Sequence, residues 1–171
     1  SLTLLVNNAI DRNSTTATSS DLTLREALAK SRDLAGTERI EFDASLSGAT
    51  ILLLSSLNEL HVASAVEIAG LGTSRTVIKS GGTHRVIVVD PGVTTSFSGL
   101  TVTGGAGVGE GGGIFTWGRL TLDQVAIVGN QATWSGSSIG TGGGIVTRNV
   151  SGRNDAALRM INSTVDGNRA A

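Results

Sequence analysis

The chain has 171 residues, of which 24 are glycine, one is proline and none is cysteine, and its formal net charge is −1. The lack of cysteine excludes disulfides, thiolate metal sites and cysteine nucleophiles, and the small, dispersed charge gives no electrostatic reason to bind nucleic acid or an anionic membrane. No apolar run approaches the roughly 20 residues of a membrane span, so we expect a single domain over residues 1–171 that does not insert into a membrane.

The first 36 residues predict a strand, a loop and one helix. LTLLVNNAI and the polar segment after it form the N-terminal strand and loop of residues 1–20. We expect a short capping helix over residues 21–36, because Thr23 and Glu26 have the spacing of a capping box, in which the hydroxyl and the carboxylate each accept from a free backbone amide. Apolar or small residues follow at helical spacing, and Gly36 provides a left-handed stop.

After the helix, residues 37–171 predict the coils of a repeating β structure. The expected strands are bounded by Gly, Ser, Asn or Asp, and they cover residues 40–42, 51–54, 66–70, 76–80, 86–89, 97–104, 114–117, 120–129, 144–147 and 158–167. Residues 97–105 align with 122–130 at an offset of 25, residues 119–132 align with 157–170 at an offset of 38, and GGGI recurs at an offset of 31. Matched strands at unequal offsets favour a solenoid, because a solenoid absorbs length differences in its loops.

Two glycine runs and two Gly-Asn pairs mark the expected corners of these coils. A phosphate-binding loop needs a helix directly after its glycines, whereas a strand-like segment follows each run here. Asn tolerates left-handed geometry and bonds to its own backbone, so asparagines stacked in successive coils could form a ladder. The corner residues are Gly111, Gly112, Gly113, Gly142, Gly143, Gly144, Asn130 and Asn168.

The order of these motifs resembles a known family. The segments LREAL (24–28), GLTVTGG (99–105), GGGIF (111–115) and LTLDQVAIVGN (120–130) are similar to those of bacterial pectate-lyase-like surface proteins with an N-terminal CSLREA-type capping motif. Asp21-Leu22-Thr23 stands where that family often has Cys-Ser or Gly-Ser. The resemblance implies an all-β fold, a right-handed parallel β-helix (solenoid) with a short N-terminal capping α-helix, in a secreted or cell-surface protein.

This resemblance implies a non-catalytic structural or adhesive module. The sequence reaches its end directly after a full repeat, without a polar cap, and an uncapped coil exposes strand edges and an apolar cross-section. Two explanations remain open: the chain is part of a longer protein, or its open coil stacks on another copy into a filament, with residues 1–10 as a donated strand. The expected partners are therefore other copies, further domains of a longer chain, or glycans.

The alternative is a carbohydrate-active enzyme or a glycan-binding β-helix. Arg148, Arg153 and Asp155 provide the basic and acidic groups that a polysaccharide lyase would use, and Trp117 and Trp134 are candidates for stacking on sugar rings. Surface ion pairs and packing at coil corners are the structural explanations of the same residues, and arginine rarely gives up its proton.

Cofactors and metal ions are not expected. Calcium-binding β-rolls need an Asp at a fixed place in every repeat, and the carboxylates of this chain do not recur in register, which leaves calcium as a weak alternative at a single site. His61 and His84 are the only histidines, and neither has a Ser or a carboxylate at the spacing of a hydrolytic triad.

Overall fold

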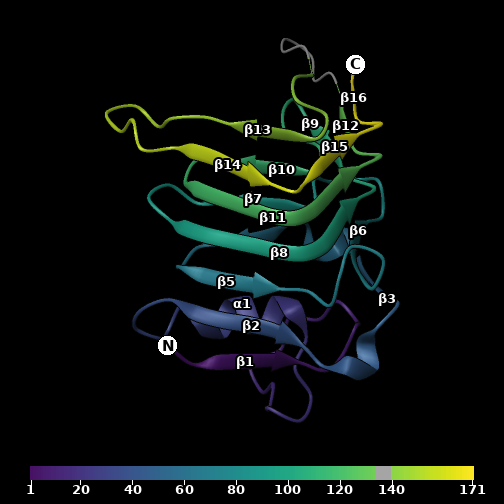
Figure 1. The fold of residues 1–171 in the computed structure, drawn as a ribbon, viewed down its shortest axis with the longest axis vertical. Helices are drawn as coiled ribbons and strands as arrows, with labels where there is room; N and C mark the ends of the chain where they lie inside the picture. The colour runs from purple at the N-terminus through teal and green to yellow at the C-terminus, as the bar shows by residue number, and fades with distance from the viewer. Residues whose placement is uncertain (134–139) are drawn as a thin grey trace.

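The computed structural model describes residues 1–133 and 140–171, and it shows a parallel β-solenoid whose coils stack along the long axis (Figure 1). All pairings between its strands are parallel, and each coil lies beside segments that are far away in the sequence. The prediction of an all-β solenoid with one short α-helix is confirmed.

Successive coils contribute strands to the same three sheets. One sheet has the order β1-β2-β5-β8-β11-β14, with β3, β6 and β15 joined through the second halves of the long strands; the others are β13-β10-β7-β4 and β16-β12-β9. The strands are β1 (Thr3–Val6), β2 (Glu38–Phe42), β3 (Ala49–Leu53), β4 (Leu60–Val62), β5 (Val66–Ala69), β6 (Thr76–Ser80), β7 (Ile87–Val89), β8 (Thr94–Thr103), β9 (Ala106–Val108), β10 (Ile114–Thr116), β11 (Arg119–Val128), β12 (Gln131–Thr133), β13 (Ile145–Thr147), β14 (Ala157–Ile161), β15 (Thr164–Asp166) and β16 (Arg169–Ala170). Short 3-10 turns occupy Ala44–Leu46 and Ser55–Leu57.

The predicted repeats are confirmed by the strand register. β8 pairs with β11 at an offset of 25, as Phe97 opposite Leu122 shows. β11 pairs with β14 at an offset of 38, so that Leu122 lies opposite Met160, and β10 pairs with β13 at an offset of 31. The unequal offsets therefore come from loops of different length between strands that remain in register.

The long strands β8 and β11 bend from one face of the solenoid to the next (Figure 1). Each bend contains one residue in the left-handed region, Gly99 with a φ of 58° and Gln124 with a φ of 53°. The strands pair on both sides of these residues, so the two bends lie opposite each other. Asn162, with a φ of 48°, separates β14 from β15 in the next coil and continues the same column.

The core consists of apolar columns that run through the stack. Alternate residues of each strand point inward, and parallel pairing places one above another. One such column contains Leu4, Ile40, Ile68, Phe97, Leu122 and Met160. Its members up to Leu122 are buried, and full burial of one such side chain stabilises the fold by about 1.5–3 kcal/mol.

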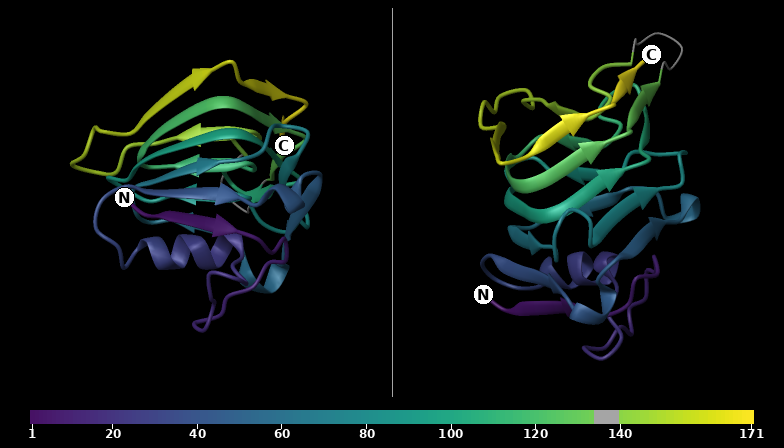
Figure 2. Two further views of the ribbon diagram at one scale, coloured as in Figure 1. Left: turned by 60° about the horizontal axis from the view of Figure 1, so that its bottom comes forward. Right: turned by 45° about the vertical axis from the view of Figure 1, so that its right-hand side comes forward.

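Helix α1 (Leu24–Ser31) lies across the N-terminal end of the coils, where its apolar side joins the core (Figure 2). The helix is shorter than the predicted 21–36, because the last turns close with amide-to-carbonyl bonds three residues apart, such as Arg32 N to Ala29 O at 3.3 Å. Gly36 has a φ of 104°, but it lies beyond these turns, and the residue that ends the helix is Arg32. The prediction that Gly36 stops the helix is therefore wrong.

The N-terminal strand pairs within its own chain. β1 lies parallel to β2, with Leu4 opposite Ile40, and extends the large sheet by one strand. In this structure the first coil of the same chain takes up the strand, and donation of residues 1–10 to another copy stays a prediction.

Candidate functional site

Glu26 is a buried carboxylate at the start of α1. It accepts hydrogen bonds from the backbone amides of Thr23 (3.0 Å) and Ser14 (3.2 Å). It also forms an ion pair with Arg12, whose Nε and Nη2 donate to the two carboxylate oxygens at 2.7 and 3.0 Å. Thr23 Oγ1 accepts from the Glu26 amide at 3.4 Å, so the predicted capping box is present. The hydrogen bonds from Arg12 lower the pKa of Glu26 to about 2, against the effect of burial. A carboxylate that stays charged near neutral pH is a structural anion and a poor general acid.

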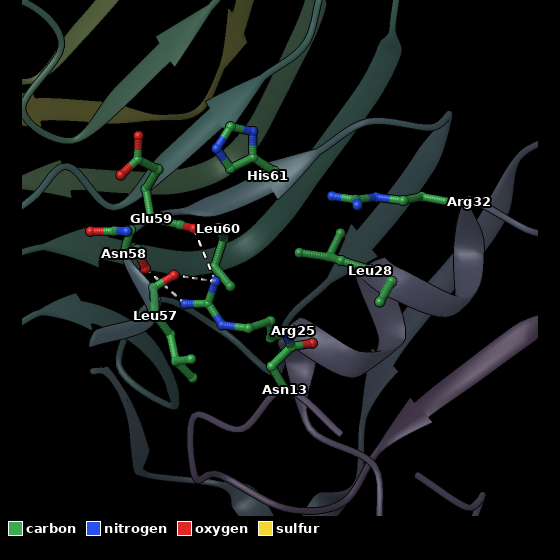
Figure 3. A pocket seen from close by; sticks show the side chains of 10 residues that line it. Asn13, Arg25, Leu28, Arg32, Leu57, Asn58, Glu59, Leu60 and His61 are labelled. Atoms are coloured by element: carbon green, nitrogen blue, oxygen red, sulfur yellow. Dashed lines mark hydrogen bonds between the residues drawn. The ribbon is translucent and has the colours of Figure 1, made fainter. Parts of the chain in front are cut away.

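Arg25, which directly precedes Glu26, holds the helix against the first coil. Its Nε and Nη2 donate to the two carboxylate oxygens of Asp11 at 2.7 and 3.0 Å. The remaining N–H groups donate to the carbonyl oxygens of Leu57 (3.1 Å), Asn58 (2.8 Å) and Glu59 (3.0 Å), as the dashed lines of Figure 3 show. All five donors of the guanidinium are used, so Arg25 holds the cap in place and has none left for a ligand.

A hollow of about 310 Å³ opens beside this guanidinium, between α1 and the loop that leads into β4 (Figure 3). Its walls combine charged side chains with primary amides, and its apolar lining comes from the helix, from the 3-10 turn that ends at Leu57 and from β4. The lining residues are Asn13, Arg25, Leu28, Ala29, Arg32, Leu57, Asn58, Glu59, Leu60 and His61.

The predicted corner glycines lie where the chain approaches the backbone of the next coil. Gly111 and Gly142 have φ values of 63° and 60°. The Gly113 amide donates to the carbonyl oxygens of Gly143 and Gly144, both at 3.0 Å, and a Cβ added at Gly113 would lie 2.5 Å from the Gly144 oxygen. Strands β10 and β13 follow the two runs directly, so the local structure is that of coil corners and lacks the helix N-terminus of a phosphate loop.

The predicted asparagine ladder is present in the two uppermost coils. Asn130 Nδ2 donates to Asn168 Oδ1 at 2.9 Å, and the Asn130 amide donates to the same oxygen at 2.9 Å. Asn130 Oδ1 accepts from the Gly105 amide of the coil below at 3.0 Å. Because Asn130 is buried, these bonds satisfy polar groups inside the turn, and they link three successive coils.

An aromatic pair lies on the sheet that contains β10. The ring centroids of Phe115 and Trp117 are 4.3 Å apart, with an interplanar angle of 58°, and the Arg85 guanidinium lies 5.1 Å from the Phe115 centroid. Phe115 is buried and Trp117 is partly exposed, so packing accounts for the first ring and most of the second. Trp134, the other candidate for stacking on sugars, lies outside the described residues.

The three residues proposed for a polysaccharide lyase form two separate ion pairs. Arg148 pairs with Glu110, whose Oε1 also accepts from Thr141 Oγ1 at 3.2 Å. Arg153 pairs with Asp155 at 3.2 Å, within the loop between β13 and β14. Both arginines are more than half exposed, which is the arrangement of surface ion pairs.

Among residues 1–133 and 140–171, no group of three or more His, Asp or Glu side chains is arranged to hold a metal ion. In the same residues, no helix is long and apolar enough to cross a membrane. His61 Nδ1 lies 3.4 Å from Asp90 Oδ1, and the buried His84 Nδ1 lies 2.6 Å from the carbonyl oxygen of Arg85. The two histidines therefore have separate local partners.

Comparisons of the chain with protein-family models, curated proteins and solved structures found no match. The resemblance to bacterial β-helix surface proteins therefore rests on the sequence motifs at residues 24–28, 99–105, 111–115 and 120–130, while the parallel β-solenoid rests on the strand register.

The sequence interpretation did not identify the partners of the cap. Arg25 lies within the LREAL motif, but no spacing in the sequence links it to its partners. Asp11 is 14 residues away, and the three carbonyl groups that Arg25 also binds are more than 30 residues away. Arg12 was likewise missed. It lies 14 residues before Glu26 of the capping box, and a basic residue ahead of the helix is a signal that could have been tested for an ion pair.

Proposed function

We propose that this chain is a non-catalytic structural or adhesive β-solenoid module that works outside the cell or on its surface. We further propose that its uppermost coil, which consists of β13, β14, β15 and β16, receives another coil. The location outside the cell is supported by the resemblance to bacterial surface proteins. The receiving role is supported by the difference between the two ends of the stack, because a helix covers one end and apolar side chains are exposed at the other.

The observation that carries this proposal is the exposure of the uppermost apolar columns. Leu122 and Ile127 of β11 are fully buried, whereas the residues above them in register, Met160 and Val165, are 38% and 45% exposed. Among the described strands, β14, β15 and β16 each pair on one side alone (Figure 1). A free strand edge beside an apolar cross-section is a template for further pairing, so a coil placed here would bury both.

At the opposite end, the helix covers the columns. Leu24, Ala27 and Leu28 of α1 are buried in the same core as the first coil. The two ends therefore differ in kind, because one is closed by a helix and the other presents the groups on which a further coil could form.

In the 171-residue chain alone, we expect this coil to drive self-association. Light scattering coupled to size-exclusion chromatography should give a molar mass that rises with protein concentration. The variant Val165→Glu should shift this rise to at least about tenfold higher concentration, because a carboxylate buried in a new interface is strongly unfavourable.

The matched control is Leu52→Glu, since Leu52 is 49% exposed on the flank of the first coil. This variant should associate as the unchanged chain does, and circular dichroism should show that both variants keep their fold. A constant monomer mass at all concentrations, or equal effects of the two variants, would contradict the proposal.

The proposal contains no catalytic step. Arg148 and Arg153 each have an acidic partner on the surface, and a screen against uronate polysaccharides with and without Ca²⁺ addresses the enzyme alternative. Turnover that is lost in Arg153→Ala would replace the structural proposal with that of a lyase.

A further inference from the structure

The hollow beside α1 is lined by the positively charged side chain of Arg32, which is not part of the contacts that hold the helix. Arg32 lies at the end of the helix with an exposed side chain, and among the described residues no hydrogen bond or ion pair engages its guanidinium. Figure 3 shows this guanidinium pointing from the helix toward the strand that carries His61. Arg25, in contrast, has all of its donors occupied by the cap.

The other groups in the hollow suit a small polar molecule. Asn13 and Asn58 present exposed primary amides, each able to donate and to accept. Ala29 and Leu57, both partly exposed, contribute an apolar lining on which a carbon skeleton can rest. The volume of about 310 Å³ lies at the lower end of the range for small-molecule sites, which begins at about 300 Å³.

The surrounding charges favour a single negative charge on that molecule. Glu59 is the one carboxylate among the residues that line the hollow, and it lies 3.9 Å from Arg85. The Glu59 carboxylate would repel a dianion such as phosphate more strongly than a monoanion, while the planar guanidinium of Arg32 can bind a carboxylate through two parallel hydrogen bonds.

We propose that this hollow is a binding site for a small hydroxylated monocarboxylate, with the carboxylate on Arg32 and the hydroxyl groups on Asn13 and Asn58. The site is independent of the coil-stacking proposal, because it lies at the helix-covered end of the molecule.

Isothermal titration calorimetry with D-gluconate tests the site. Sorbitol is the matched probe, since it has the same carbon chain and hydroxyl groups with an alcohol in place of the carboxylate, and it should bind at least about tenfold more weakly because a charge-assisted pair is lost. Inorganic phosphate should also bind more weakly than gluconate.

The variant Arg32→Gln should weaken gluconate binding by at least about tenfold, whereas Arg119→Gln, a change at an exposed arginine on β11, should leave it unchanged. Amide chemical shifts of Asn58 and His61 should move on titration of the unchanged chain. The proposal is overturned if gluconate does not bind, if sorbitol or phosphate binds as well, or if the two arginine variants behave alike.

Discussion

Glu26 couples the stability of the cap to pH. Its ion pair with Arg12 and its bond from the Thr23 amide lower its pKa from 4.5 to about 2, so the folded state prefers the charged form. The resulting stability is present above the pKa of the unfolded chain and is lost as the pH falls from about 4.5 toward 2. A shift of this size on a buried group corresponds to roughly 3 kcal/mol.

We therefore expect Glu26→Gln to lower the free energy of unfolding at pH 7 by about 2–3 kcal/mol. Urea denaturation at several pH values should show that the variant loses less stability than the unchanged chain between pH 4.5 and 2. The control Glu41→Gln removes a carboxylate from a pair with Arg39 in which both side chains are more than 40% exposed, and it should change stability by less than about 1 kcal/mol. Equal acid sensitivity of Glu26→Gln and the unchanged chain would refute this account.

At the level of single residues, local chemistry was predictable and distant partners were not. Thr23 and Glu26 are three residues apart, so the capping box could be predicted from spacing. The ligands of Arg25 come from segments on both sides of the helix, and only the closed first coil brings them together. The hollow beside Arg32 depends on that same closure, which explains why no sequence pattern indicated it.

The bends in the long strands are the elements that determine how the coils turn. Gln124 occupies the left-handed region at its bend, where Gly99 stands in the coil below and Asn162 in the coil above. Gly and Asn adopt this region readily, whereas a residue such as Gln is strained there by roughly 1–2 kcal/mol. The side chain of Gln124 is exposed, so it contributes little packing in return.

The variant Gln124→Gly should therefore raise the free energy of unfolding by about 0.5–1 kcal/mol, and Gln124→Val should lower it by at least about 1 kcal/mol, because β-branched residues are true outliers in this region. Denaturant unfolding monitored by circular dichroism provides both values. As a matched change, Gln131→Gly in β12 alters a residue outside the left-handed region and should destabilise by about 0.5–1 kcal/mol. A loss of stability in Gln124→Gly would show that the bend is not strained.

Strand prediction succeeded in segments rich in β-branched or aliphatic residues and missed four very short strands. The segment 76–80 was predicted with the bounds of β6, and the repeats that contain β8 and β11 were aligned in the correct register. Strands β4, β9, β12 and β16 were missed. They have two or three residues each, and they are held by neighbouring coils, so their own sequences contain too little pattern to be recognised.

The molecule is a stack in which the strands of each coil pair with those of the adjacent coils, so stability should vary along its axis. The strands β8 and β11 have partners on both sides, whereas β14, β15 and β16 have a described partner on one side. Every residue of β15 and β16 is exposed, while β8 and β11 each contain several buried residues. Local opening should therefore begin in the uppermost coil and should expose little of the core beneath it.

Hydrogen exchange followed by mass spectrometry should show this gradient in dilute protein. Amides of β14 and β15 should exchange at least about a hundredfold faster than those of β8, because opening the uppermost coil disrupts one interface and opening β8 disrupts two. At concentrations where the molar mass rises, the same amides should become protected, since a second copy would then cover the exposed columns of Met160 and Val165. The Val165→Glu variant should keep fast exchange at both concentrations. Protection of β14 and β15 equal to that of β8 in a dilute monomer would mean that the uppermost coil is stable without a partner, and the apolar columns would then provide no reason for stacking.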